Sequence, residues 1–164
     1  GNVSDGSTSY RVSIWKGVIK IIKEYFFSGV GVGEAAFKNI YPLVSHEGIE
    51  LAPHSHSLYF QLVVEVGILG LILFVVLMAL LFRRSFSFFD SKNNIYPYTG
   101  REALRLRMLS AAGVCGIFSM LLQGFTDYVW YNYRIFLMFW MVIGLTVAVG
   151  RAVRENTLSP DRCL

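Results

Sequence analysis

The sequence predicts an all-α protein, a fragment of a polytopic membrane helical bundle with three transmembrane helices and an outer amphipathic helix. Hydrophobic residues make up 54% of the 164 residues and charged residues only 16%, and the mean hydropathy is +0.50. Soluble domains of this size carry more charge. The apolar residues are also gathered in three runs, and a helix needs about 20 such residues to cross a bilayer core of roughly 30 Å.

The three apolar runs define the predicted spans. Residues 58–82 contain a single charged residue, Glu65, and residues 108–125 contain none. Residues 135–149 form a shorter run. Four aromatic residues lie before it and can form an interfacial belt; they are Tyr128, Trp130, Tyr131 and Tyr133. We therefore expect a transmembrane helix at each of the three places.

Lysine and arginine residues near the helix ends predict the orientation. The loop 83–107 holds six basic residues against two acidic ones, and arginines open the tail 150–164. Basic and acidic residues balance in the segments 1–57 and 126–134. We therefore expect residues 1–57 and 126–134 on the extracytoplasmic side. We expect residues 83–107 and 150–164 in the cytoplasm. The pI of 9.2 then follows from inner-loop charges, and no nucleic-acid partner is expected.

Residues 11–27 predict the amphipathic outer helix. Lysines occupy one face, and apolar side chains recur at helical spacing on the other; these are Trp15, Val18, Ile19, Ile22, Tyr25 and Phe26. The helix is too charged to span, so we expect it on the outer membrane surface or packed on the bundle. Arg11 continues the apolar stripe at the helix start, where a guanidinium can hold a phosphate or carboxylate. The alternative is an arginine that snorkels from the helix end.

His54 and His56 come directly before the first span. Three interpretations are open: interfacial histidines without a task, a metal site shared with His46 and with Glu47 or Glu50, or a proton-transferring histidine at a membrane-surface active site. Glu65 lies about 10 Å into the span, where a carboxylate should face the protein interior or a wet cavity. Gln61 lies one turn above Glu65 on the same face. A polar track from His56 through Gln61 to Glu65 is therefore predicted.

Several stretches resemble the bacterial O-antigen ligase family. A His-Ser pair, nine residues and Gly-x-x-Gly, beginning at His56, resemble the family signature, and HSLYFQLVVEVGILGLILF is similar to it throughout. Arg11-x-x-x-Trp15 resembles the family's Arg-x-x-x-Leu element, with Trp in place of Leu. EYFFSGVGVGEAAF and DYVWYNYRIFLMFWMVIGL are similar to two further family passages. The resemblance extends over residues 11–150.

The resemblance implies an integral-membrane glycosyltransferase, either a ligase or a polymerase. Such an enzyme moves a glycan from a polyprenyl diphosphate carrier to a glycan, lipid or protein acceptor. It would act at the extracytoplasmic face of the bacterial inner membrane, without a metal or another cofactor. The implied catalytic residues are His56, as base for the acceptor hydroxyl, and Arg11, as the cation for the diphosphate.

Four supporting residues are predicted around this pair: Glu65, Gln61, His54 and Arg134. The first two would orient His56, and His54 is the lower-ranked alternative base. Arg134 is the weaker alternative cation, since pairing with Asp127 explains it more simply.

Two other functions stay open on the sequence. The chain could be a fragment of a transporter or channel with a proton path through Glu65, or a metal-dependent membrane hydrolase that uses the three histidines. The opening GNVSDGSTSY is typical of the middle of a loop and shows no start methionine or signal-peptide pattern. We therefore expect earlier helices in a longer protein and no activity from this segment alone.

Overall fold

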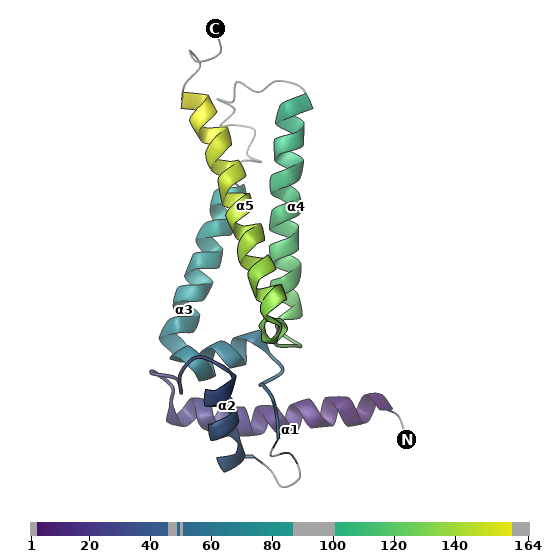
Figure 1. The fold of residues 1–164 in the computed structure, drawn as a ribbon, viewed down its shortest axis with the longest axis vertical. Helices are drawn as coiled ribbons and strands as arrows, with labels where there is room; N and C mark the ends of the chain where they lie inside the picture. The colour runs from purple at the N-terminus through teal and green to yellow at the C-terminus, as the bar shows by residue number, and fades with distance from the viewer. Residues whose placement is uncertain (1–2, 46–48, 50, 87–100, 159–164) are drawn as a thin grey trace. The chain divides into compact units, whose positions relative to one another are not determined.

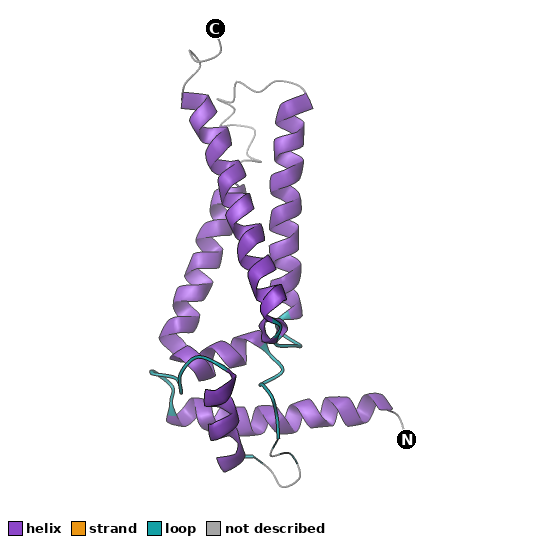
Figure 2. Cartoon of the chain, viewed as in Figure 1, coloured by secondary structure: helices purple, strands orange, loops and turns teal. Residues whose placement is uncertain are grey.

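A computed structural model describes residues 3–45, 49, 51–86 and 101–158. The helices, in chain order, are α1 Val3–Glu24, α2 Glu34–Ile40, the 3₁₀ helix η1 Tyr41–Leu43, α3 Leu58–Phe86, α4 Arg101–Gln123, the 3₁₀ helix η3 Val129–Tyr131 and α5 Tyr133–Leu158 (Figure 1). The described residues contain no strand (Figure 2). The all-α prediction is therefore confirmed.

The chain divides into two compact units. Unit 1 consists of Gly1–Val75 and Leu122–Asn132, and unit 2 consists of Val76–Leu121 and Tyr133–Leu164. Unit 1 holds α1, α2, η1, η3 and the first part of α3. Unit 2 holds the remainder of α3 with α4 and α5.

Among the described residues, three helices are long and apolar enough to cross a membrane, as the fold class predicted. They are Leu58–Phe86, Leu104–Gln123 and Tyr133–Arg151. The helices extend beyond the predicted spans, because each added residue gains a backbone hydrogen bond at little cost once a helix exists. α3 continues to Phe86 and α5 to Leu158. The middle of the predicted cytoplasmic loop, 87–100, lies outside the described residues.

α1 begins earlier than the sequence suggested. The expected loop at the start of the chain is helical from Val3, and the helix ends at Glu24. Its buried stripe is Ile14, Val18 and Ile21, whereas Ile19 is 42% exposed. The amphipathic helix is therefore present, but its buried face is rotated from the predicted one.

The buried face of α1 contributes to the core of unit 1. Phe37 of α2 stacks on Tyr41 of η1, with ring centroids 5.2 Å apart and planes 13° apart. The complete cluster is Ile14, Val18, Ile21, Phe37, Tyr41, Ala52 and Val64. The last two come from the loop before α3 and from α3 itself. The core therefore fixes α1 against the start of α3, which is where the predicted site residues lie.

α3 is broken at Gly67, which has φ 71° and ψ −179°. This backbone conformation is nearly exclusive to glycine. The loop after α1 takes over the interrupted hydrogen bonds: Ile68 N–H donates to Phe26 O at 2.9 Å, and Val30 N–H donates to Val64 O at 2.7 Å. Gly31 N–H likewise donates to Glu65 O at 3.1 Å. Roughly 19 residues, about 28 Å of helix, follow the break and are long enough to cross a bilayer.

The glycine at the break also admits the loop sterically. A Cβ atom at Gly67 would meet Phe27 O, and a Cβ atom at Gly29, where φ is 65°, would meet Glu65 O. The segment that approaches Gly67 closely is therefore the loop backbone.

Unit 2 packs its helices through small and aromatic side chains. Gly113 of α4 lies against Thr146 of α5, a close backbone approach typical of membrane helices. Phe82 of α3 contacts Phe118 of α4, with ring centroids 6.2 Å apart. Many other apolar side chains of this unit are exposed, including Leu109 and Leu145. Outward apolar side chains are expected where a helix faces lipid.

Candidate active site

The loop before α3 is held in place by four hydrogen bonds of unit 1. Trp15 Nε1 donates to Ser55 O at 2.9 Å, which ties the loop to α1. Ser55 N–H donates to Gln61 Oε1 at 2.9 Å. At the start of α3, Leu58 N–H and the Ser57 hydroxyl both donate to Gly124 O, at 2.8 and 3.3 Å. Three separate elements therefore fix the loop that carries the two predicted histidines.

His56 has an unusual backbone within this loop. Its φ is 52°, the left-handed region, and among the described residues no other non-glycine residue has a positive φ. This conformation costs on the order of 1 kcal/mol or more. The fixed neighbours Ser55 and Ser57 maintain it. Such strain clusters at functional sites, and here it determines where the imidazole points.

The imidazole of His56 lies beside a carboxylate. His56 Nδ1 is 3.6 Å from Asp127 Oδ1, and the same carboxylate oxygen accepts a 2.9 Å hydrogen bond from Tyr128 N–H. The His56 side chain is 20% exposed and that of Asp127 44%. Tyr10 of α1 approaches the imidazole edge-on, with ring centroids 6.2 Å apart. The arrangement is that of a base with a partner able to orient it.

Three influences act on the pKa of His56, and the pKa is lowered overall. Burial lowers it most, and the positive charge of Arg11 lowers it further, whereas Asp127 raises it. The imidazole is therefore neutral at pH 7 and able to accept a proton. The charge of Arg11 acts on the imidazole, so the two residues for which catalytic roles were predicted lie in the same part of unit 1.

His54 is more enclosed than His56. It is 8% exposed, and its ring lies 4.7 Å from that of Tyr131 and 4.3 Å from that of His56, measured between centroids. Its Nδ1 accepts a hydrogen bond from His56 N–H at 3.2 Å. Burial, followed by the neighbouring His56, lowers the pKa of His54 to about 4. His54 therefore supports the His56 backbone as a neutral side chain.

The predicted polar track takes a different route from the one expected. Gln61 Nε2 donates to Glu65 Oε1 at 2.9 Å, so these two side chains do pair. The carboxamide oxygen of Gln61 accepts its hydrogen bond from Ser55 N–H and not from the imidazole of His56. Glu65 is therefore linked to the backbone of the histidine loop.

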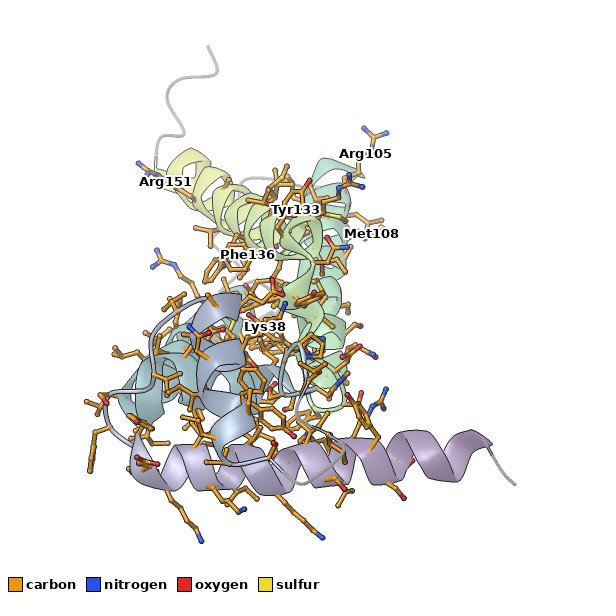
Figure 3. All side chains as sticks on the ribbon, turned by 60° about the horizontal axis from the view of Figure 1, so that its bottom comes forward. Lys38, Arg105, Met108, Tyr133, Phe136 and Arg151 are labelled. Carbon is orange, nitrogen blue, oxygen red and sulfur yellow. The ribbon has the colours of Figure 1, made fainter. Side chains whose placement is uncertain are left out.

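A cavity of about 170 Å³ opens beside this track. Its lining combines carboxylates, a carboxamide, histidine and three aromatic side chains: Glu34, Glu65, Gln61, His54, Tyr128, Trp130 and Tyr131, with Val32, Gly33 and Pro53. Burial, with the nearby Glu65, raises the pKa of Tyr128 to about 12, so its hydroxyl stays protonated. Glu34 forms an ion pair with Lys38, labelled in Figure 3.

Arg134 belongs to unit 2. Its Nε lies 3.4 Å from Tyr133 Oη, and its guanidinium carbon lies 5.8 Å from the centroid of that ring.

The other histidine and acids proposed for a metal site, His46, Glu47 and Glu50, lie outside the described residues.

Asp127 is the site residue that the sequence analysis missed. It was considered only as a partner for Arg134, because the two are close in sequence. Its contact with His56 depends on the hydrogen bonds from Leu58 N–H and Ser57 Oγ to Gly124 O, which join the start of α3 to the turn after α4. The available signal was an acid on the same predicted side of the membrane as the histidines.

The same cluster could also hold a cation. Ligand atoms of His54, His56 and Asp127 all lie within 4.8 Å of one another. Tetrahedral zinc with ligands at about 2.1 Å places them about 3.4 Å apart. Small side-chain movements would be enough to close the cluster around an ion, so both interpretations of the histidines have a geometric basis.

A comparison with protein families finds a match for part of the chain. Residues 2–75 match the model of a family described as O-Antigen ligase. This part of the chain is therefore similar to the O-antigen ligase family. The match includes the histidine loop, Arg11, Gly67 and Gly70, and it ends at residue 75, so the similarity of DYVWYNYRIFLMFWMVIGL stays a prediction. No curated protein and no solved structure matches the chain. With three helices able to cross a membrane, the chain is an O-antigen ligase-like membrane protein.

Proposed function

We propose that this chain carries the transfer centre of a glycosyltransferase that moves a glycan from a polyprenyl diphosphate to an acceptor hydroxyl. The contact of His56 with Asp127 beside the charge of Arg11 is the observation that carries the proposal. The family match supports a ligase-like activity in general terms.

The reaction assigns one role to each side chain. The acceptor hydroxyl gives its proton to His56, and its oxygen forms a bond to the anomeric carbon of the donor. The bond from that carbon to the diphosphate oxygen breaks, and polyprenyl diphosphate leaves with the electron pair. Arg11 stabilises the negative charge that develops on the leaving group. Asp127 orients His56 and stabilises its imidazolium form.

The proposed location follows from charge. The positive-inside rule places the loop 83–107 in the cytoplasm and the histidine loop on the extracytoplasmic side. The enzyme would therefore act at the extracytoplasmic face of its membrane. From the family resemblance we further propose that this is the bacterial inner membrane and that the transfer needs no metal.

The test is glycan transfer from a lipid-linked donor in membranes that contain the longer protein in which these residues are expected to lie. His56→Ala should lower the rate about 10²- to 10⁴-fold, the range for loss of a general base, and Arg11→Ala should lower it similarly. Lys16→Ala is the matched control for α1, because its side chain is exposed on the opposite face. Wild-type rates in both His56→Ala and Arg11→Ala would contradict the proposal.

A metal-dependent hydrolase is the second candidate. The cluster of His54, His56 and Asp127 favours it. The hydrolase would require a bound metal and all three ligands equally. In the transferase His56 is the base, and His54 is not required as a ligand.

A further inference from the structure

A groove in unit 2 combines an apolar lining with two arginines. It has a volume of about 340 Å³ and lies between the last part of α3 and the second half of α5. Leu81, Ile143 and Val147 contribute apolar surface, and Arg84, Ser85 and Arg151 contribute polar groups. Unit 2 alone forms this groove.

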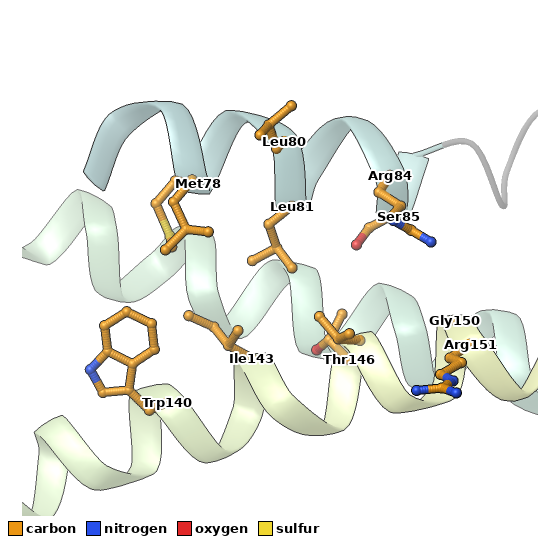
Figure 4. Close-up of a pocket in the computed structure, with 12 residues that line it drawn as sticks. Met78, Leu80, Leu81, Arg84, Ser85, Trp140, Ile143, Thr146, Gly150 and Arg151 are labelled. Carbon is orange, nitrogen blue, oxygen red and sulfur yellow. The ribbon is translucent and has the colours of Figure 1, made fainter. Parts of the chain in front are cut away.

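The polar groups are segregated at one end. Arg84, Ser85 and Arg151 lie together there, and Ile143 and Trp140 lie toward the other end (Figure 4). Arg84 is in the last turn of α3, and Ser85 is buried, with 3% of its surface exposed. The groove is therefore amphipathic along its length.

Further positive charge surrounds this end. Arg83 is in the same last turn of α3 as Arg84. Arg105 and Arg151, labelled in Figure 3, lie at the same end of unit 2. Guanidinium groups at the end of membrane helices attract anionic headgroups, and basic pockets between such helices bind them. The charge pattern therefore calls for an anion attached to an apolar chain.

We propose that this groove binds an anionic glycerophospholipid. The headgroup phosphate would lie between Arg84 and Arg151, where guanidinium groups can bind its oxygens in a bidentate way, with the Ser85 hydroxyl beside it. The apolar part of the groove spans about 9 Å from Arg84 to Met78 along α3, which accommodates the first part of an acyl chain. By the positive-inside rule this is the cytoplasmic leaflet, which is rich in anionic lipid.

This proposal is independent of the transfer reaction. Its residues lie at the predicted cytoplasmic helix ends, and none of them belongs to the histidine cluster. A lipid bound here would join the ends of α3 and α5 through one phosphate. It would therefore stabilise unit 2.

Lipid selectivity in reconstituted bilayers tests the proposal. The full chain is placed in bilayers of phosphatidylcholine and phosphatidylglycerol in equal amounts, and spin-labelled phosphatidylglycerol measures the motionally restricted lipid. Removing either Arg84 or Arg151, the two arginines that line the groove, should weaken the preference for phosphatidylglycerol about fivefold. We expect Arg84→Gln with Arg151→Gln to abolish it. The matched control, Arg83→Gln with Arg105→Gln, removes the same charge outside the groove and should keep the preference within about twofold.

A second pair of variants tests the apolar part without changing charge. Val147→Phe adds bulk to the groove and should lower the amount of bound phosphatidylglycerol. Leu145→Phe adds bulk on the same helix at a residue that does not line the groove, and it should not. Equal loss in both arginine pairs, no preference in the wild type, or displacement of phosphatidylglycerol by undecaprenyl phosphate at equal concentration would each overturn the proposal.

Discussion

The indole Nε1 of Trp15 donates a 2.9 Å hydrogen bond to Ser55 O, so α1 directly holds the loop that carries His56. The Arg-x-x-x-Leu element that Arg11-x-x-x-Trp15 resembles has leucine at this position. Leucine cannot donate a side-chain hydrogen bond. Trp15 also packs edge-on against Phe60, with ring centroids 5.6 Å apart. The substitution therefore gives this chain an additional restraint on the strained residue.

Replacing Trp15 should loosen the histidine loop without removing a catalytic group. Trp15→Phe keeps an aromatic ring near Phe60 but loses a hydrogen bond that contributes about 1 kcal/mol, so we expect transfer to slow about fivefold. Trp15→Leu loses the ring contact as well and should be slower still. Initial rates with the lipid-linked donor measure both. A Trp15→Phe rate equal to wild type would show that the bond does not position His56.

Asp127→Asn should weaken His56 as a base. The amide cannot stabilise the imidazolium, so we expect the rate at pH 7 to fall about 10- to 100-fold, within the total attributed to general-base catalysis. Asp127 raises the pKa of His56, so removing its charge lowers that pKa. A rate that requires neutral His56 rises with pH through this pKa, and its acid limb should therefore move to lower pH.

The matched control for Asp127→Asn is Glu24→Gln. Glu24 is another carboxylate of unit 1, but it is exposed at the end of α1 and does not line the cavity. The pH–rate profile of Glu24→Gln should overlay the wild-type profile. A shift of the acid limb to higher pH in Asp127→Asn is inconsistent with the proposed role.

Membrane helices were predictable because length and hydropathy alone identify them. The buried face of α1 was harder to predict from the sequence, because the apolar stripe did not include Gly17. A Cβ atom at Gly17 would lie 3.0 Å from the Tyr41 ring. This close approach makes the Gly17 side of α1 the buried one, with Ile14, Val18 and Ile21, and leaves Ile19 exposed.

Two features define the site: the break of α3 at Gly67 and the position of Asp127 beside His56. Both depend on contacts between residues that are far apart in the sequence. The break at Gly67 requires the loop after α1 as a replacement hydrogen-bond partner, and the local sequence shows only a glycine in an apolar run. The position of Asp127 beside His56 likewise depends on Gly124 receiving hydrogen bonds from the start of α3. Spacing predicted His56 and Arg11 as candidates, but spacing cannot supply a partner from another segment.

Gly67→Ala should destabilise unit 1. Alanine is strained at φ 71° by about 1–3 kcal/mol, and its methyl group would also meet Phe27 O. We expect a lower Tm in detergent and reduced transfer. Gly116→Ala is the control, since a Cβ atom there meets nothing within 4 Å and alanine favours helix by up to about 1 kcal/mol. Equal Tm values for the two variants would argue against the loop contact at the break.

Metal chelation separates the two candidate functions. We expect EDTA to leave glycan transfer unchanged and His54→Ala to slow it less than tenfold, because His54 supports the loop and does not take the proton. A zinc-dependent hydrolase should instead lose activity in EDTA and contain one zinc per chain by elemental analysis. It should also lose activity equally in His54→Ala, His56→Ala and Asp127→Asn.

Glu65 and Gln61 differ in what their replacement should do. Glu65→Gln keeps an oxygen that can accept the hydrogen bond from Gln61, so we expect transfer near the wild-type rate. Gln61→Leu leaves the buried Ser55 N–H and the Glu65 carboxylate without this partner, at a cost of about 1–3 kcal/mol. It should therefore lower both Tm and transfer. In a transporter with a proton path through Glu65 the order reverses: Glu65→Gln abolishes proton flux in vesicles, and Gln61→Leu is the milder change.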